Sequence, residues 1–461
     1  MRNLTPVDAF MALRGLGMPF IFSGRKDGPR RHSYVSAEPL LTIKTEGKKT
    51  VAEYASGNRK LQFKDPFEAL NRLLPDWVYE KNTTFPFNSG AAGYFAYSLK
   101  DLIEPRRRKD ASAEKGVKLI LDIPDCVCGI YDPIFVYDHL MDTGYLVGTG
   151  REKERFKRFL EILNGAPCVR TFANGFIATS PNTISANVTK EEYAASIKKA
   201  QDYIAAGDIY QINISQRLKI PYTPGSDLFA LYLKLLDAYP TPYGAFLDFG
   251  KFQIICNSPE RLLKVKDGVA ETGPIKGTRK RGATLEEDAA LIAELKASVK
   301  ERAEHVMIVD LERNDLGRVC ETGSVEVSSF EAIATYPHLH HMVSIVRGKL
   351  GKGVTSIDAL KSLFPGGSVT GAPKIRAMEI ISELERAERG VYTGGVGWLD
   401  FDGNMDVSMA IRTAVCKDGF LYLNVGGGIV ADSNPEDEYA ETLLKARDFL
   451  DTMGIGVYEG K

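Results

Sequence analysis

A short basic stretch, "ETGPIKGTRKRG" at Glu271–Gly282, places one lysine, Lys276, between two glycines and follows it with three basic residues at 279–281. Glycines and basic residues together are typical of a solvated turn. A lysine amine can also act as a nucleophile where neighbouring cations favour its neutral form. The pattern therefore leaves two interpretations open, a surface turn or a chemical reagent.

Two predicted helices each carry a pair of carboxylates on one face. Glu301 and Glu304 are three residues apart, and Glu438 and Glu441 are three apart after an Asn-Pro helix start at 434–435. Residues at this spacing point the same way, and proline favours the first helical position. Mg²⁺ binds one or two carboxylates and keeps several waters, whereas most acidic pairs on helices are surface decoration. The pairs therefore predict a candidate Mg²⁺ site, with a solvated surface as the alternative.

Two glycine-rich segments could bring backbone N–H groups close to a ligand. The segment "PGGSVTGAPK" at 365–374 leads into a predicted helix, and amides at a helix start favour anions. It is not a P-loop, because Gly371 is followed by Ala-Pro-Lys. Gly426, Gly427 and Gly428 follow the predicted strand "FLYLNV". Close packing of the backbone would explain these three glycines equally well.

A helix and a strand open the second half of the chain. Thr189 and Glu192 form a capping box before a predicted helix that ends near Gly207. The next segment, "DIYQINISQR", alternates apolar and polar residues, as a strand does. Its polar face includes Gln211, and a strand of this kind more often meets solvent than walls an active site.

Composition excludes several classes of protein. The chain has 461 residues, 44% of them hydrophobic, and its 59 Lys and Arg balance 60 Asp and Glu. Such a chain is globular, and no global charge attracts it to nucleic acid or an anionic membrane. Six scattered cysteines without a metal-type pair indicate free thiols in a reducing compartment. Without a signal peptide or about 18 consecutive apolar residues, we expect a cytoplasmic protein.

The chain divides near its middle. The segment 164–190 is rich in Asn, Ser, Thr, Gly and Pro, which is typical of a connection. We therefore predict a sheet-rich region at 1–175 and a second domain at 185–461.

Long motifs in the second half resemble, in order and spacing, those of the chorismate-utilising enzymes, the family of anthranilate, aminodeoxychorismate, isochorismate and salicylate synthases. These motifs are "GDIYQINISQR", "SPERLL", "GPIKGTRKRG", "ERAEHVMIVDLERNDLGRV", "LFPGGSVTGAPKIRAMEIISELE", "RGVYTGGVGWLDFDGNMDVSMAIRTA" and "GGGIVADSNPEDEYAETLLKA". The resemblance covers Thr189 to Leu450 and is looser in the first half. It implies an α+β fold of two large, orthogonally packed β-sheets flanked by helices, with an active-site cleft in the C-terminal, chorismate-binding part.

The resemblance also implies roles for individual residues. Lys276 matches a nucleophile and Glu260 of "SPERLL" a general acid. Glu304 and Glu441 match Mg²⁺ ligands, flanked by Glu301 and Glu438. The residues that match substrate-binding positions are Thr278, His341, Thr370, Arg412, Gly426, Gly427, Gly428 and Lys445. The first half is similar to a region that forms a tryptophan-like pocket, here near Ser23 and Tyr34.

Two positions distinguish members of the family. Isochorismate and salicylate synthases carry a water-activating lysine where this chain has Gln211, and an amide cannot accept that proton. Anthranilate synthases typically read "PIAGT" at the position where this chain reads "PIKGT". One class of aminodeoxychorismate synthases has the same "PIKGT" motif as this chain. The resemblance thus implies Mg²⁺-dependent amination of chorismate to 4-amino-4-deoxychorismate, a precursor of folate. The reaction would pass through a covalent intermediate on Lys276. Ammonia would come from a separate glutamine amidotransferase subunit. Anthranilate formation and a non-catalytic chorismate or tryptophan sensor stay open as alternatives.

Overall fold

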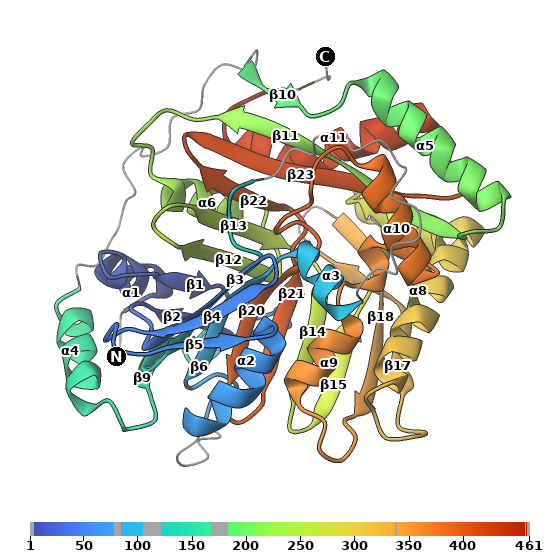
Figure 1. The fold of residues 1–461 in the computed structure, drawn as a ribbon. Helices are drawn as coiled ribbons and strands as arrows, with labels where there is room; N and C mark the ends of the chain where they lie inside the picture. The colour runs from blue at the N-terminus through green and yellow to red at the C-terminus, as the bar shows by residue number, and fades with distance from the viewer. Residues whose placement is uncertain are drawn as a thin grey trace.

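Two large antiparallel β-sheets form the centre of the protein. The computed structural model describes residues 4–77, 84–104, 121–166, 183–336, 339–456 and 458. In these ranges the first sheet has 11 strands and the second has 12. In Figure 1, β11 and β23 of the first sheet run across the view, whereas β14 and β15 of the second run up and down it. The predicted α+β fold with two large sheets is confirmed.

The first sheet joins strands from both ends of the chain. In spatial order its strands are β10 (Ser185–Ala186), β11 (Gln211–Pro221), β23 (Phe420–Ile429), β22 (Thr413–Lys417), β13 (Gln253–Ser258), β12 (Tyr243–Asp248), β1 (Phe20–Phe22), β2 (His32–Ser36), β8 (Ile134–Asp138) and β9 (Thr143–Val147), with β19 (Gly371–Ala372) paired to β11.

The second sheet also combines strands from both halves of the chain. Its strands are β16 (Ile275–Lys280), β18 (Leu339–Lys349), β15 (Val269–Gly273), β14 (Arg261–Lys266), β21 (Met405–Met409), β20 (Gly395–Asp400), β6 (Gly90–Phe95), β7 (Cys126–Tyr131), β3 (Leu41–Glu46), β4 (Lys49–Tyr54) and β5 (Lys60–Phe63), with β17 (Glu326–Thr335) paired to β18.

Helices cover the outer faces of both sheets. They are α1 (Pro6–Leu13), α2 (Pro66–Leu73), α3 (Lys100–Ile103), α4 (Lys153–Asn164), α5 (Lys190–Ala205), α6 (Leu228–Ala238), α7 (Leu285–Ala297), α8 (Val299–Gly317), α9 (Ser356–Leu363), α10 (Lys374–Leu384) and α11 (Pro435–Thr452). Helices α5 and α11 pack on β11 and β23, and α8 packs on β16 and β18 (Figure 1). None of the described helices has the length and apolar character needed to cross a bilayer.

The predicted helix starts are present. The Thr189 side chain accepts a hydrogen bond from the Glu192 amide at 3.2 Å, and the Glu192 carboxylate accepts one from the Thr189 amide at 3.0 Å. Asn434 accepts from two amides of the first turn of α11, whose first residue is Pro435. Gly207 follows α5 with φ of +80°, as expected of a residue that ends a helix.

The expectation of a solvent-facing polar side on β11 was wrong. Gln211, Asn213, Ser215 and Arg217 are all buried. The segment after α10 lies against them, and its Glu385 accepts hydrogen bonds from the Ser215 amide and hydroxyl, each at 2.9 Å. Partners satisfy only part of this buried face, because the side-chain oxygens of Gln211 and Asn213 have no hydrogen-bond partner among the described residues.

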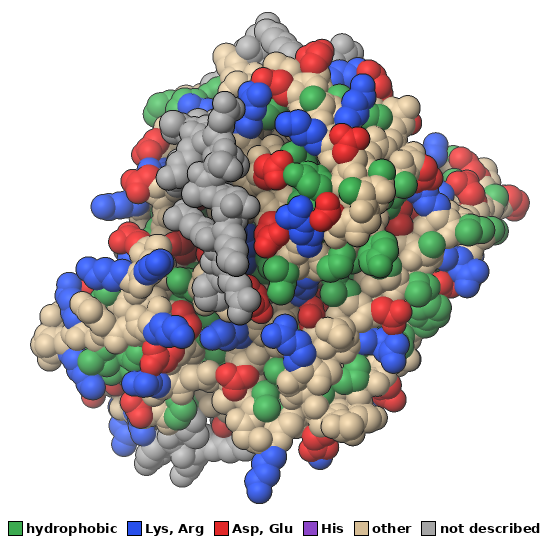
Figure 2. Space-filling view, turned by 45° about the vertical axis from the view of Figure 1, so that its right-hand side comes forward, with side chains coloured by type: hydrophobic (Ala, Val, Ile, Leu, Met, Phe, Trp, Pro, Cys, Tyr) green, Lys and Arg blue, Asp and Glu red, His purple; other side chains and the backbone are tan. Residues whose placement is uncertain are grey.

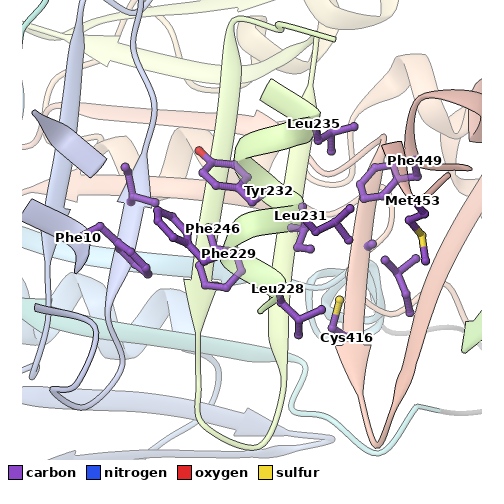
Figure 3. Close-up of a cluster of buried hydrophobic side chains, with 14 of the residues drawn as sticks. Phe10, Leu228, Phe229, Leu231, Tyr232, Leu235, Phe246, Cys416, Phe449 and Met453 are labelled. Atoms are coloured by element: carbon purple, nitrogen blue, oxygen red, sulfur yellow. The ribbon is translucent and has the colours of Figure 1, made fainter. Parts of the chain in front are cut away.

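One hydrophobic core links the beginning and the end of the chain. Phe10 of α1 stacks on Phe229 of α6 with ring centroids 4.1 Å apart. Figure 3 shows the same cluster reaching Phe449 and Met453 at the end of α11. Strands from 1–175 and 185–461 also pair within both sheets. The boundary predicted between these segments falls mostly at 167–182, outside the described residues, and stays a prediction.

The distribution of surface charge and the state of the cysteines match what the composition indicates. On the face in Figure 2, basic and acidic side chains are interspersed. Each cysteine in the described ranges is a free thiol, four of them buried: Cys126, Cys128, Cys256 and Cys416. Cys168 lies outside the described residues.

Candidate active site

Lys276 lies beside Glu304 at the edge of the second sheet. Its Nζ atom is 3.8 Å from a Glu304 carboxylate oxygen, and both side chains are about one-sixth exposed (14% and 16%). The register of β16 against β18 shifts between Lys276 and Thr278, and Gly277 between them has φ of +73°. A glycine in this conformation forms a bulge that redirects the neighbouring side chains. Gly277 therefore helps to direct the Lys276 side chain towards Glu304 of α8.

The glycine run of β23 faces this lysine from the other sheet. A Cβ atom placed on Gly428 would lie 3.0 Å from the Lys276 amine and 2.6 Å from the Gln211 amide nitrogen. A Cβ on Gly427 would lie 2.9 Å from a Glu438 carboxylate oxygen. The glycines continue β23 to Ile429, where the sequence had placed them after the strand. Their missing side chains let the two sheets approach at the candidate site.

The four predicted metal-site carboxylates occupy this region. Burial raises the pKa of Glu304. The charge of Lys276 lowers this pKa in part, and the charge of Glu301 raises it further. Burial likewise raises the pKa of Glu438, whose carboxylate accepts a hydrogen bond from Ser433 at 2.7 Å. Burial opposes ionisation of Glu441 too, but Lys445 at 2.6 Å holds its pKa below the usual value.

This donor set fits Mg²⁺. Carboxylates that hinder one another's ionisation are stabilised by a divalent cation, and Mg²⁺ needs only one or two of them as direct ligands. Within the described ranges, no three His, Cys, Asp or Glu side chains form a compact metal-binding group. The assignment of Glu304 and Glu441 as Mg²⁺ ligands therefore stays a prediction.

Glu260 is a buried acid close to Lys276. It lies between β13 and β14 with 5% of its surface exposed, and Ser368 donates a 2.6 Å hydrogen bond to its carboxylate. Burial raises its pKa to about 7, against the opposing effects of Ser368 and Lys276. A carboxyl desolvated in this way can hold a proton near neutral pH, and its role as a general acid stays a prediction.

His341 and Arg412 lie near each other. The Thr278 hydroxyl is 2.9 Å from Nδ1 of His341. Burial, and then the charge of Arg412, lower the pKa of His341 to about 4, so its ring is neutral at neutral pH. Arg412 has φ of +47° and donates to Asp448 at 2.6 Å. Backbone strain of this kind gathers at functional sites.

The remaining predicted substrate-binding side chains have partners within the protein. Lys445 donates to the Gly426 carbonyl at 2.9 Å as well as to Glu441. Thr370 is fully buried and donates to the Gly366 carbonyl at 2.9 Å. Thr370 thus fastens the turn at 366–370, and contact of these two residues with substrate stays a prediction.

The arginines after Lys276 are paired with acids. Arg279 donates to Glu294 at 2.9 Å and to Glu301 at 3.4 Å, and Arg281 pairs with Asp288 at 2.8 Å. Carboxylates compensate both charges, so these arginines give little support to a neutral amine at Lys276.

Ser23 and Tyr34 have been predicted to line a tryptophan-like pocket. The Ser23 hydroxyl is 2.7 Å from the Tyr232 hydroxyl. Tyr34 is buried, and its ring packs edge-on to Phe87 and Trp398 with centroids 5.4 and 5.5 Å away. The two residues lie near each other, since Phe22 pairs with Tyr34 across β1 and β2, and ligand binding there stays a prediction.

Two residues of this region were missed in the sequence. Ser368 carries no distinguishing signal in a turn already rich in small residues. Glu312 lies eleven residues after Glu301, which is three helical turns along the same face of α8, and this spacing could have revealed it.

Comparison with known proteins agrees with the fold and with these motifs. Residues 18–451 match the family described as chorismate binding enzyme. The chain is 37% identical to anthranilate synthase component 1 of Aquifex aeolicus (98% of this chain, 92% of the relative) and 39% identical to aminodeoxychorismate synthase component 1 of Bacillus subtilis (90% and 88%). The crystal structure of anthranilate synthase component I from Streptococcus pneumoniae superposes with a TM-score of 0.79 at 32% identity, covering 97% of both chains. The chain therefore belongs to the chorismate binding enzyme family.

Proposed function

We propose that this chain is the chorismate-aminating component I of an aminodeoxychorismate synthase, which converts chorismate and ammonia to 4-amino-4-deoxychorismate for folate synthesis. One observation carries the proposal. The Lys276 amine lies between Gly428 and Glu304, close enough to Glu260 to influence its ionisation. A nucleophile beside a buried acid can displace a leaving group that the acid protonates.

Two successive displacements would convert chorismate to the product. The Lys276 nitrogen bonds to ring carbon 2, the double bond shifts, and the bond from carbon 4 to its hydroxyl breaks. Glu260 gives its proton to that oxygen, which leaves as water. Ammonia then bonds to carbon 4, the double bond shifts back, and the bond between carbon 2 and Lys276 breaks. Lys276 leaves as the neutral amine, and the ammonium formed at carbon 4 returns one proton to the Glu260 carboxylate, so both groups regain their starting states.

Binding of the substrate needs cations, because chorismate carries two carboxylates. Arg412, Lys445 and the amides of 426–428 would hold them, and a guanidinium offers a planar pair of donors. Glu304 and Glu441, supported by Glu301 and Glu438, would hold Mg²⁺, which neutralises the ring carboxylate and withdraws electron density from the ring.

Ammonia is proposed to come from a separate glutamine amidotransferase subunit, as the designation component 1 of the relatives suggests. Free ammonium salts should replace this subunit in the reaction.

Anthranilate formation is the second candidate. The relative from Aquifex aeolicus and the structure from Streptococcus pneumoniae both carry that name. Lys276 favours the 4-amino product, because its side chain fills space through which ammonia would reach carbon 2. The buried acid Glu260 argues against a non-catalytic sensor, since binding alone requires no proton donor.

Product analysis with purified protein, chorismate, Mg²⁺ and ammonium chloride tests the proposal. Without ammonia, mass spectrometry should find a covalent adduct on the peptide that contains Lys276. Lys276→Ala should lose the adduct and the 4-amino product, whereas Lys280→Ala, at an exposed position on the same strand, should keep both. A Lys276→Ala variant that makes 4-amino-4-deoxychorismate at the parental rate would refute the proposal.

A further inference from the structure

A second buried acid lies behind the candidate site. Glu312 of α8 is 2% exposed, and its Oε1 atom accepts a hydrogen bond from the Gly367 amide at 3.1 Å. Its Oε2 atom has no hydrogen-bond partner in the part of the chain that the structure describes. None of the steps above uses this carboxyl, although leaving a buried polar group partly unsatisfied costs stability.

The surroundings of Glu312 favour its neutral form. Burial raises its pKa to about 8, and the charges that face it belong to Lys374, Asp315 and Glu260. Lys374 would favour ionisation, but its amine forms an ion pair with Asp315 and donates to the Leu363 carbonyl at 3.1 Å. The cation is therefore shared with another acid, and a protonated Glu312 remains a good acceptor through its carbonyl oxygen.

The turn that Glu312 binds is the same turn that supports Glu260. Gly367 donates to Glu312, and the next residue, Ser368, donates to Glu260 at 2.6 Å. A Cβ atom on Gly367 would lie 2.6 Å from the Leu311 side chain and 3.1 Å from Glu312, so only glycine lets the turn come this close to α8. The hydrogen-bond donors to the two carboxyls are therefore adjacent residues of one turn.

We propose that Glu312 is a positioning residue, which fixes the Gly367 amide so that the Ser368 hydroxyl holds the Glu260 carboxyl in line for proton transfer. The proposal rests on the proposed function, in which Glu260 is the general acid. Proton transfer depends on the placement of the donor within hydrogen-bonding reach, so loosening this turn should lower turnover more than substrate binding.

The direction of the pH effect follows from the contacts. The Ser368 hydrogen bond lowers the pKa of Glu260. When the turn loosens, that bond is lost and the pKa of Glu260 rises. Because a general acid works in its protonated form, the basic limb of the rate profile should then move to higher pH.

The test compares Glu312→Ala with Glu312→Gln in steady-state kinetics from pH 6 to 9, with chorismate, Mg²⁺ and ammonium chloride. The alanine variant removes the acceptor, and we expect kcat to fall by about tenfold or more, the equivalent of one lost hydrogen bond. Its KM for chorismate should stay within about twofold, because a positioning role affects the transition state rather than binding. The glutamine variant keeps a neutral acceptor and should rescue kcat and the parental pH profile.

Ser368→Ala supplies an independent readout, because it leaves the core around Glu312 intact. It should reproduce the shift of the basic limb, and the double variant with Glu312→Ala should add little to either single change. An unshifted limb in Ser368→Ala overturns the inference even where Glu312→Ala fails to fold. A glutamine variant as impaired as the alanine variant overturns it too.

Kinetics of Glu260→Gln and Glu312→Ala distinguish failure of the positioning role from failure of the proposed function. If Glu260→Gln loses activity while Glu312→Ala keeps the parental kcat and pH profile, the inference alone is wrong. If Glu260→Gln retains full activity, Glu260 is no general acid and both are wrong.

Discussion

Replacing Glu260 with glutamine should lower the rate of turnover and raise the stability of the folded protein at high pH relative to the parent. The substitution preserves shape and keeps an oxygen that accepts the hydrogen bond from Ser368, but it removes the transferable proton. We expect kcat to fall on the order of 10²-fold or more, the usual contribution of a general acid.

As the proposed general acid, Glu260 should set the basic limb of the parent protein's pH profile. Burial moves the pKa of this carboxyl from its ordinary value of 4.5 to about 7. At pH 7 about half of the molecules then hold the proton, against about 0.3% at the ordinary pKa, so burial increases the active fraction on the order of 10²-fold. The rate should fall roughly fivefold between pH 7 and pH 8.

The same shift destabilises the folded protein at high pH. Because the folded-state pKa is raised, the folded protein keeps a proton that the unfolded chain has released between about pH 4.5 and 7. The free energy of unfolding therefore decreases as pH rises through this window, by about 3 kcal/mol for this one group. Glu260→Gln lacks this loss, so its thermal midpoint relative to the parent should increase from pH 5 to pH 8.

Asp400 provides a matched control. It is a buried acid at the end of β20, burial raises its pKa to about 6, and it accepts a hydrogen bond from the Asn88 amide at 2.7 Å. Asp400→Asn should change the pH dependence of stability in the same direction and leave the basic limb of kcat in place. A Glu260→Gln protein with the parental rate, or a parental rate that stays flat between pH 7 and pH 8, would refute the reasoning.

Three further predictions concern the metal, the glycine run and the buried ion pair. Glu304→Ala and Glu441→Ala should each abolish turnover at any practical Mg²⁺ concentration, and near-normal activity in a Mg²⁺ titration of either variant would contradict their role. Gly428→Ala should lower kcat about tenfold or more, because its methyl group would displace the neighbouring amide and amine; Gly15→Ala, with open space around it, should have parental kinetics. Arg389→Met should cost about 3–5 kcal/mol of stability, measured by denaturation, because it leaves Glu385 buried without its cation. A stability equal to the parent's would show that the pair is dispensable.

Local features of the structure could be predicted from the sequence. The Thr189 capping box and the Asn434 cap depend on contacts within one helical turn, so neighbouring residues specify them. The spacing of Glu301 and Glu304 placed both on one helix, and the order and spacing of the long motifs in the second half indicated the family.

Other features required the packed chain. Whether the polar face of β11 meets solvent depends on the segment after α10, which is more than 150 residues away in sequence. The sequence left open whether the charges after Lys276 act on its amine, and the structure pairs Arg279 and Arg281 with acids of the segment 288–301. Alternation and composition carry no information on such distant partners.

The sequence by itself determined the caps, the periodicity of helices and strands, and the set of residue types able to aminate chorismate, because each depends on near neighbours or on side-chain chemistry. Only the tertiary structure decided that Glu260 is desolvated beside Lys276, and that Glu312 reaches it through the turn at 366–368. The physical reason is that burial is a property of what packs around a group. A carboxyl exposed in the unfolded chain has an ordinary pKa, and it becomes an acid suited to neutral pH only when distant strands and helices exclude water from it.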